Sequence, residues 1–283
     1  MADSKLPIAT TGATGNLGGR VALALADQGT IQRMLVRDLA RAPVLMGATT
    51  AAFSYGDKRA SVTALRGLKV LFMVSASESA DRLERHQTFI DAAAEAGIEH
   101  IVYTSFAGAA QNATFTLARD HWATEEHIRA SGMTYTLLRD NFYIDFLPAL
   151  AGTDGVIRGP AGEGRVAAVC REDIGRVAVA VLNDPDRHAN ATYDLSGPEA
   201  LTLTEVGAVI SAVTGRVTSF YDESLEEART SRQQWDPPPW QMDAWISTYV
   251  AIADGSLQQV TTVVEDLTAR RPLSLRDFLI KGA

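Results

Sequence analysis

Short apolar runs alternate with amphipathic segments along the first half of the chain. Segments 19–28, 81–96 and 117–131 have helical spacing, and each is followed by a glycine. Glycine commonly follows a helix end because it adopts the left-handed conformation at little cost. The apolar runs comprise residues 7–11, 31–37, 50–55, 70–75, 100–105 and 134–139. Strands and helices in this alternation predict an α/β fold with a doubly wound parallel sheet that carries helices on both faces.

A glycine-rich segment, residues 11–18 with the sequence Thr-Gly-Ala-Thr-Gly-Asn-Leu-Gly, joins the first apolar run to the first helical segment. This is the context that the dinucleotide-binding fingerprint of Rossmann-type folds requires. Gly12 permits a tight turn, Gly15 lets the backbone approach a pyrophosphate, and Gly18 lets the helix pack closely on the strand. The free amides and the dipole of the helix N-terminus favour anions. The predicted dinucleotide contacts in this segment are Gly12, Thr14, Gly15, Asn16, Leu17 and Gly18; a glycine turn without a ligand is the alternative.

Arg37 stands at the end of the second apolar run, where Rossmann-type proteins distinguish NAD from NADP. A carboxylate at this place binds the ribose 2′-hydroxyl of NAD, whereas an arginine accommodates the 2′-phosphate of NADP. Arg41 follows four residues later, and Asp38, one residue past the expected place, argues for NAD. Because a guanidinium suits phosphate geometry, we predict NADPH as the cofactor. The alternative is that Arg37 only begins a solvated loop.

Further cofactor contacts are predicted at the later apolar runs. Val74 and Ser75 end the fourth run, where the ribose and the nicotinamide are expected to pass. Tyr103 lies in the fifth run and is a further predicted cofactor contact. Asp57 follows the third run, and its carboxylate either contacts the adenine edge or caps the next helix.

The composition excludes several classes of protein. The chain has one cysteine, Cys170, so an intramolecular disulfide is impossible, and its formal net charge of −8 disfavours nucleic-acid binding. No apolar run approaches the roughly 20 residues that cross a bilayer, and residues 1–5 lack the apolar segment of a signal peptide. We therefore expect a cytoplasmic protein that binds neither nucleic acid nor a membrane.

The second half of the chain has a different pattern. Five glycines between residues 152 and 164 indicate a loop or hairpin, and residues 172–182 have helical spacing. Thr202 with Glu205, and Ser274 with Asp277, have the spacing of capping boxes that start helices. We expect residues 1–150 to form the NAD(P)-binding domain. Residues 151–283 are expected to form a smaller, mostly helical substrate-binding lobe, some segments of which return to the sheet.

Several of these segments together resemble the NmrA-like family of atypical short-chain dehydrogenases/reductases. The resemblance rests on the glycine-rich start and on residues 35–38, 103–105, 172–178 and 195–202. Residues 121–125 and 132–141 are similar to its NADPH-dependent quinone oxidoreductase and triphenylmethane reductase branch. The resemblance implies an extended Rossmann fold with a C-terminal lobe and NADPH as the cofactor. Some members reduce quinones or dyes, and others bind the dinucleotide without turnover and regulate transcription through a protein partner.

The chain lacks the Tyr-x-x-x-Lys pair with which ordinary short-chain dehydrogenases protonate a carbonyl oxygen. None of its seven tyrosines is followed by lysine four residues later. In related sequences the helix near residue 117 carries that pair, and the resemblance places His121 and Glu125 at the corresponding positions. Both residues share one face of this helix. His121 is expected to hold or protonate a substrate oxygen while Glu125 orients the ring; a buried structural pair is the alternative. No metal site is predicted.

Hydride transfer to a quinone mainly requires orientation, and no strongly tuned acid is essential. Flat acceptors are expected to lie against aromatic side chains, for which the candidates are Phe142, Tyr143, Phe146, Trp235 and Trp240; Tyr143 is also a candidate catalytic residue. The predicted function is NADPH-dependent reduction of a quinone-like or other conjugated small molecule by a monomer or homodimer. The alternatives are a redox-sensing regulator without turnover and a reductase of a specialised metabolite.

Overall fold

The computed structural model describes residues 7–282 of the 283-residue chain. Within this range the Cα positions divide into two compact units. Unit 1 contains residues 7–105, 121–139 and 174–193, and unit 2 contains residues 106–120, 140–173 and 194–282. This division differs from a single boundary at residue 150, because segment 174–193 joins unit 1 and segments 106–120 and 140–150 join unit 2.

A seven-stranded sheet organises unit 1, with the strand order β3-β2-β1-β4-β5-β6-β9. Its strands are β1 (Ile8–Thr11), β2 (Gln32–Val36), β3 (Ala48–Ala52), β4 (Val70–Met73), β5 (His100–Phe106), β6 (Thr134–Asp140) and β9 (Ala191–Leu195). β1 pairs in parallel with β2 and β4, β2 with β3, and β4 with β5. The strand order reverses between β1 and β4, which is where ligands bind in open α/β sheets.

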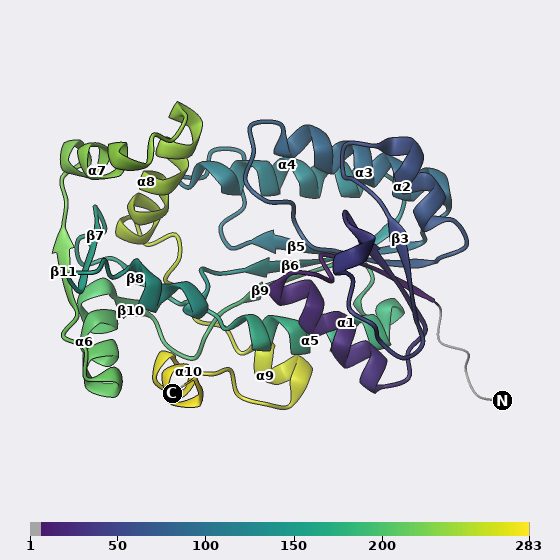
Figure 1. The fold of residues 1–283 in the computed structure, drawn as a ribbon. Coiled ribbons are helices and arrows are strands. Elements are labelled where there is room, and N and C mark those ends of the chain that lie inside the picture. The colour runs from purple at the N-terminus through teal and green to yellow at the C-terminus, as the bar shows by residue number, and fades with distance from the viewer. Residues whose placement is uncertain (1–6, 283) are drawn as a thin grey trace. The chain divides into compact units, whose positions relative to one another are not determined.

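Helices cover both faces of this sheet (Figure 1). One face carries α1 (Asn16–Asp27) and α5 (Arg171–Asn183), and the other carries α2 (Lys58–Leu65), α3 (Arg82–Ala96) and α4 (Thr116–Ala130). The predicted doubly wound α/β fold is therefore confirmed. α3 ends at Gly97, whose φ of 84° is the left-handed conformation that the sequence predicted there.

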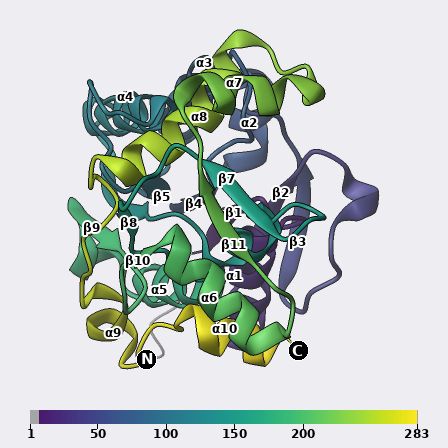
Figure 2. The same ribbon diagram turned by 90° about the vertical axis from the view of Figure 1, so that its left-hand side faces the viewer.

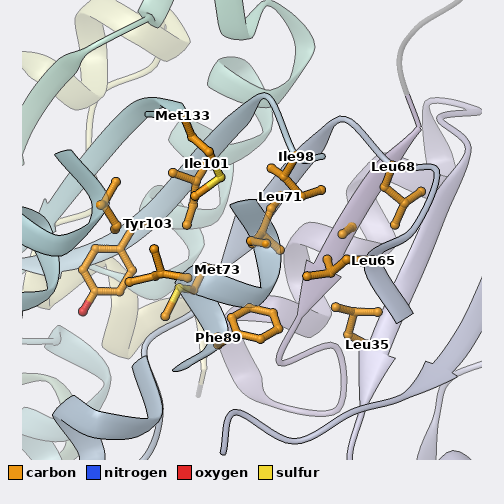
Figure 3. Close-up of a cluster of buried hydrophobic side chains, with 14 of the residues drawn as sticks. Leu35, Leu65, Leu68, Leu71, Met73, Phe89, Ile98, Ile101, Tyr103 and Met133 are labelled. Carbon is orange, nitrogen blue, oxygen red and sulfur yellow. The ribbon is translucent and has the colours of Figure 1, made fainter. Parts of the chain in front are cut away.

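A large apolar cluster fills the space between the sheet and helices α2 and α3 (Figure 3). Leu35, Leu71 and Ile101 of the strands and Leu65 and Phe89 of the helices are fully buried. Each such side chain contributes about 1.5–3 kcal/mol relative to its exposed state. Tyr103 closes one end of the cluster, and its hydroxyl points away from the apolar side chains (Figure 3).

Unit 2 is built from two small sheets and several helices (Figure 2). The parallel pair is β7 (Val156–Gly159) with β11 (Ser219–Asp222), and the antiparallel pair is β8 (Arg165–Val166) with β10 (Leu201–Thr202). The glycine-rich segment 152–164, expected to be a loop or hairpin, thus contributes β7, which pairs with the distant β11. The helices of this unit are α6 (Leu203–Thr214), α7 (Leu225–Arg232), α8 (Pro239–Ala253), α9 (Val263–Thr268) and α10 (Leu275–Lys281), with the 3₁₀ segment η2 (Ile144–Leu150).

Both predicted capping boxes are present, at Thr202 before α6 and at Ser274 before α10. Ser224 and Glu227 form a third, unpredicted capping box before α7. Among residues 7–282, no helix has the length and apolar character needed to cross a membrane.

Candidate cofactor and active site

The glycine-rich loop turns sharply between β1 and α1. Gly12 has a φ of +67°, which favours glycine, and its carbonyl oxygen accepts a hydrogen bond from the N–H of Gly15 at 2.8 Å. A Cβ atom on Gly18 would lie 2.4 Å from the same oxygen. Glycine is therefore required at position 18 for α1 to begin this close to β1.

The N-terminus of α1 has the features of an anion-binding site. Gly15 is the N-cap residue, and no side chain in the described part of the chain caps the helix. Thr14, Gly15 and Asn16 are exposed, whereas Leu17 is buried and anchors the first turn. Because the first amides of a helix lack intrahelical partners, they are available to a phosphate group together with the helix dipole. The loop thus fits the pyrophosphate of a dinucleotide.

Arg37 follows β2 and is exposed, as is Arg41. Within the described residues neither guanidinium has an acidic partner. The carboxylate of Asp38 instead accepts the N–H of Ala40 at 3.0 Å and caps a short 3₁₀ turn. Asp38 therefore argues less strongly for NAD than its position in the sequence suggests, because its carboxylate already caps a turn. Both arginines are free to bind a phosphate.

Asp57 caps α2, because its Oδ1 accepts the N–H of Ala60 at 2.9 Å. The sequence left open whether Asp57 contacts the adenine or caps the helix, and the structure shows the helix cap. A contact between Asp57 and the adenine stays a prediction.

Side chains from three other elements hold the segment after β4, which contains the predicted cofactor contacts Val74 and Ser75. All three backbone N–H groups of residues 74–76 donate to side chains: Val74 to Thr11 Oγ1 (2.8 Å), Ser75 to Thr104 Oγ1 (2.8 Å) and Ala76 to His86 Nε2 (2.9 Å). The hydroxyl of Tyr55 donates to the carbonyl oxygen of Val74. A segment held in this way presents a fixed surface to a ligand.

His121 belongs to the same buried network. Arg82 donates from Nε to the carbonyl oxygen of Ala76 at 2.9 Å and from Nη2 to His121 Nε2 at 2.8 Å. A guanidinium only donates, so Nε2 is the acceptor, and the ring proton of neutral His121 lies on Nδ1, 2.9 Å from the hydroxyl oxygen of Tyr103. Burial and then the positive charge of Arg82 hold the pKa of His121 well below its ordinary value.

Both ring nitrogens of His121 therefore have protein partners, and the ring is neutral at physiological pH. Tyr103 is fully buried, and its hydroxyl faces this network. The geometry favours the structural alternative for His121, whereas direct contacts of His121 with an acceptor and of Tyr103 with the cofactor stay predictions.

Glu125 is fully buried and binds partners other than His121. Its carboxylate accepts hydrogen bonds from Ser105 Oγ at 2.6 Å, from Arg139 Nε and Nη2 at 2.8 and 2.7 Å, and from Arg129 Nη2 at 3.2 Å. The pair proposed from the sequence thus shares a helix face, but each member has its own set of partners.

In unit 2, a guanidinium lies against the predicted aromatic residues Tyr143 and Phe146. Their ring centroids are 5.8 Å apart with an interplanar angle of 21°, and Arg171 Cζ lies 4.9 Å from the first centroid and 4.2 Å from the second. Phe146 is 44% exposed, so part of this aromatic surface is open to a ligand. Arg171 was not identified from the sequence, because nothing in its local pattern distinguishes it from a helix-starting arginine.

No group of three or more His, Cys, Asp or Glu side chains in residues 7–282 could hold a metal ion. The described part of the chain thus offers a nucleotide site in unit 1 and an aromatic surface in unit 2.

Comparisons with known proteins give a consistent result. The model of the NmrA-like family matches residues 4–230. Quinone oxidoreductase 2 of Escherichia coli is 35% identical over 228 residues, which are 78% of each chain. The (4-alkanoyl-5-oxo-2,5-dihydrofuran-3-yl)methyl phosphate reductase of Streptomyces griseus is 33% identical over 282 residues, 98% of each chain.

Among solved structures, the NADPH complex of the Escherichia coli NADPH-dependent quinone oxidoreductase superposes with a TM-score of 0.87. The two chains are 30% identical, and the similarity covers 96% of this chain and 98% of the other.

Proposed function

Because the chain belongs to the NmrA-like family, we propose that it is an NADPH-dependent oxidoreductase that transfers hydride to a quinone-like or other conjugated acceptor. The observation that carries the proposal is the uncapped α1 N-terminus behind the Gly12–Gly18 turn, in a fold shared with an NADPH-bound quinone oxidoreductase. Quinones and 5-oxo-2,5-dihydrofurans, the compounds in the names of the two relatives, are both conjugated carbonyl compounds.

The residues of unit 1 have separate tasks in this proposal. The amides of Asn16 and Leu17 bind the pyrophosphate, Arg37 and Arg41 bind the 2′-phosphate, and residues 74–76 border the nicotinamide ribose. The bound dinucleotide supplies the hydride. The protein's own contribution is to orient the reactants and to exclude water, which suffices for an electron-poor acceptor.

In unit 2, Tyr143 and Phe146 provide a flat surface for the acceptor, and Tyr143 provides a hydroxyl. The proposed partner is therefore a small molecule. We further propose that the protein is cytoplasmic and that it is a monomer or homodimer.

The proposal is tested by following NADPH oxidation with the purified protein and a panel of quinones, triphenylmethane dyes and conjugated enones. Steady turnover with at least one acceptor is expected. Tight NADPH binding without turnover of any acceptor would contradict the reductase and support the redox-sensing alternative.

Cofactor preference gives a second test. Arg37→Ala is expected to weaken NADPH binding by about 1.5–3 kcal/mol, roughly 10- to 150-fold, because a charge-assisted contact to the 2′-phosphate is lost. NADH lacks that phosphate, so its affinity should hardly change. Fluorescence titration with both cofactors measures the difference, and Arg20→Ala, which removes an exposed arginine of α1, is the control. Equal affinities of the wild type for NADPH and NADH would refute the assignment of Arg37.

A further inference from the structure

A buried carboxyl group lies beside Tyr143. Asp140, at the end of β6, is fully buried, and its Oδ2 lies 3.1 Å from the hydroxyl oxygen of Tyr143. Its Oδ1 has no hydrogen-bond partner among the described residues. The backbone carbonyl oxygen of Asp140 accepts the N–H of Ala107 at 2.9 Å, so the residue is fixed at this place.

Among residues 7–282, no cation compensates the charge of this carboxyl group. Burial raises the pKa of Asp140 well above its ordinary value, and the hydrogen bond from Tyr143 only partly opposes that shift. A buried carboxylate with one neutral donor is costly, whereas a neutral carboxylic acid needs only one acceptor for its proton. The hydroxyl oxygen of Tyr143 is that acceptor, because it is the hydrogen-bond partner of the carboxyl group.

The neutral acid changes what Tyr143 is able to do. When Asp140 Oδ2 donates its proton to the hydroxyl oxygen, Tyr143 no longer donates to Asp140, and its own O–H is available to another acceptor. Tyr143 is half-buried, and its ring forms part of the aromatic surface with Phe146. The carboxyl group and the phenol thus form a hydrogen-bonded path along which a proton can pass from Asp140 through Tyr143 to this surface.

We propose that Asp140 supplies, through Tyr143, the proton that the acceptor oxygen takes up after hydride transfer. The inference rests on the proposed reductase function. Hydride adds to the acceptor, and the oxyanion takes the proton of the Tyr143 hydroxyl. The phenolate takes the proton of Asp140, and the resulting carboxylate regains a proton from solvent before the next turnover. Asp140 acts only through Tyr143 and is a positioning residue.

Two charged groups, from α5 and η2, lie near Asp140 and Tyr143. Arg171, the first residue of α5, lies over the Tyr143 ring, and its Nη1 is 4.0 Å from Oδ1 of Asp145 in η2. Asp145 also accepts the backbone N–H of Arg171 at 3.0 Å. The guanidinium therefore faces a carboxylate and two rings, and its charge favours the transient phenolate of Tyr143.

The pH profile of turnover tests the proposal. In the wild type, kcat is expected to fall as pH rises through the raised pKa of Asp140, because the carboxylate then holds no proton to pass on. In Asp140→Asn the side-chain amide still donates to Tyr143 but transfers no proton. We expect kcat to fall roughly 10- to 100-fold, less than for loss of a general acid itself, and the decline with pH at that pKa to disappear.

Three further measurements separate a proton relay from a structural role. NADPH affinity should be unchanged in Asp140→Asn, and adding Asp140→Asn to Tyr143→Phe should cost no further activity, since both act in one path. Tyr193→Phe, which removes a hydroxyl that binds His188 in unit 1, is the control and should leave kcat unchanged. An unaltered pH profile in a folded Asp140→Asn protein would overturn the proposal.

Infrared spectroscopy provides a readout that does not depend on turnover. At neutral pH the wild type should show the carbonyl stretch of a protonated carboxyl group that Asp140→Asn lacks. If that band is absent, Asp140 is ionised and the relay is refuted even where the reductase function holds. If the band is present but no acceptor is reduced, the proposed function fails and the relay fails with it.

Discussion

Replacing Glu125 with alanine is expected to lower the free energy of unfolding by about 3–5 kcal/mol, the usual cost of removing one partner of a buried ion pair. The carboxylate is fully buried and receives both nitrogens of the Arg139 fork at 2.8 and 2.7 Å. Without it, the guanidinium of Arg139 and the hydroxyl of Ser105 lose an acceptor in a place that water reaches poorly. Urea denaturation of the wild type and the variant measures the change.

The adjacent residue provides a matched control. Glu126 also pairs with Arg129, at 2.6 Å, but its side chain is 51% exposed. Glu126→Ala should therefore change the free energy of unfolding by about 1 kcal/mol or less, as is typical of exposed ion pairs. If Glu125→Ala were as stable as Glu126→Ala and yet lost turnover, Glu125 would have a chemical role, and the structural interpretation would be wrong.

The glycine-rich loop between β1 and α1 was predictable because the residues that determine its conformation lie close together in the sequence. A strand, a glycine turn and a helix within residues 8–27 require glycine at positions 12 and 18, and the structure shows the physical reason at each. The same holds for the capping boxes at Thr202 and Ser274, since a cap and its partner lie three residues apart.

The support of residues 74–76 was not predictable from the sequence, since it joins distant segments. Thr11 lies 63 positions from Val74, and Thr104 lies 29 positions from Ser75. Threonine hydroxyls in strands are common, and only the register of β1, β4 and β5 brings these two to the end of β4. The same reason applies to His86, which lies 10 positions from Ala76 and accepts its N–H only in the folded chain.

The interpretation of His121 and Glu125 shows the limit of helical spacing. The spacing places both side chains on one face of α4, but it does not identify the groups that this face meets. Those groups are Arg82, 39 positions from His121, and Arg139, 14 positions from Glu125. No sequence pattern indicates the carboxyl group of Asp140, because its burial and the lack of a partner for its Oδ1 among residues 7–282 are properties of the folded chain.

Gly15→Val is expected to weaken NADPH binding at least about 100-fold, or roughly 2.7 kcal/mol. A Cβ atom at this position would already lie 3.3 Å from the carbonyl oxygen of Gly12, which is tight packing. The two methyl groups beyond it occupy the space in which the pyrophosphate must approach the first amides of α1. Because Gly15 is exposed and precedes the helix, most of the cost should fall on the ligand and little on the fold.

A fluorescence titration with NADPH and circular dichroism on the same sample separate these two effects. Leu23→Val, which places valine on an exposed position of the same helix, controls for the helix propensity of valine and should bind NADPH like the wild type. Gly15→Ala should give an intermediate affinity, because its single methyl group removes less of the space. Wild-type affinity in a folded Gly15→Val protein would show that the pyrophosphate binds elsewhere, and the cofactor contacts assigned to residues 12–18 would then have to be abandoned.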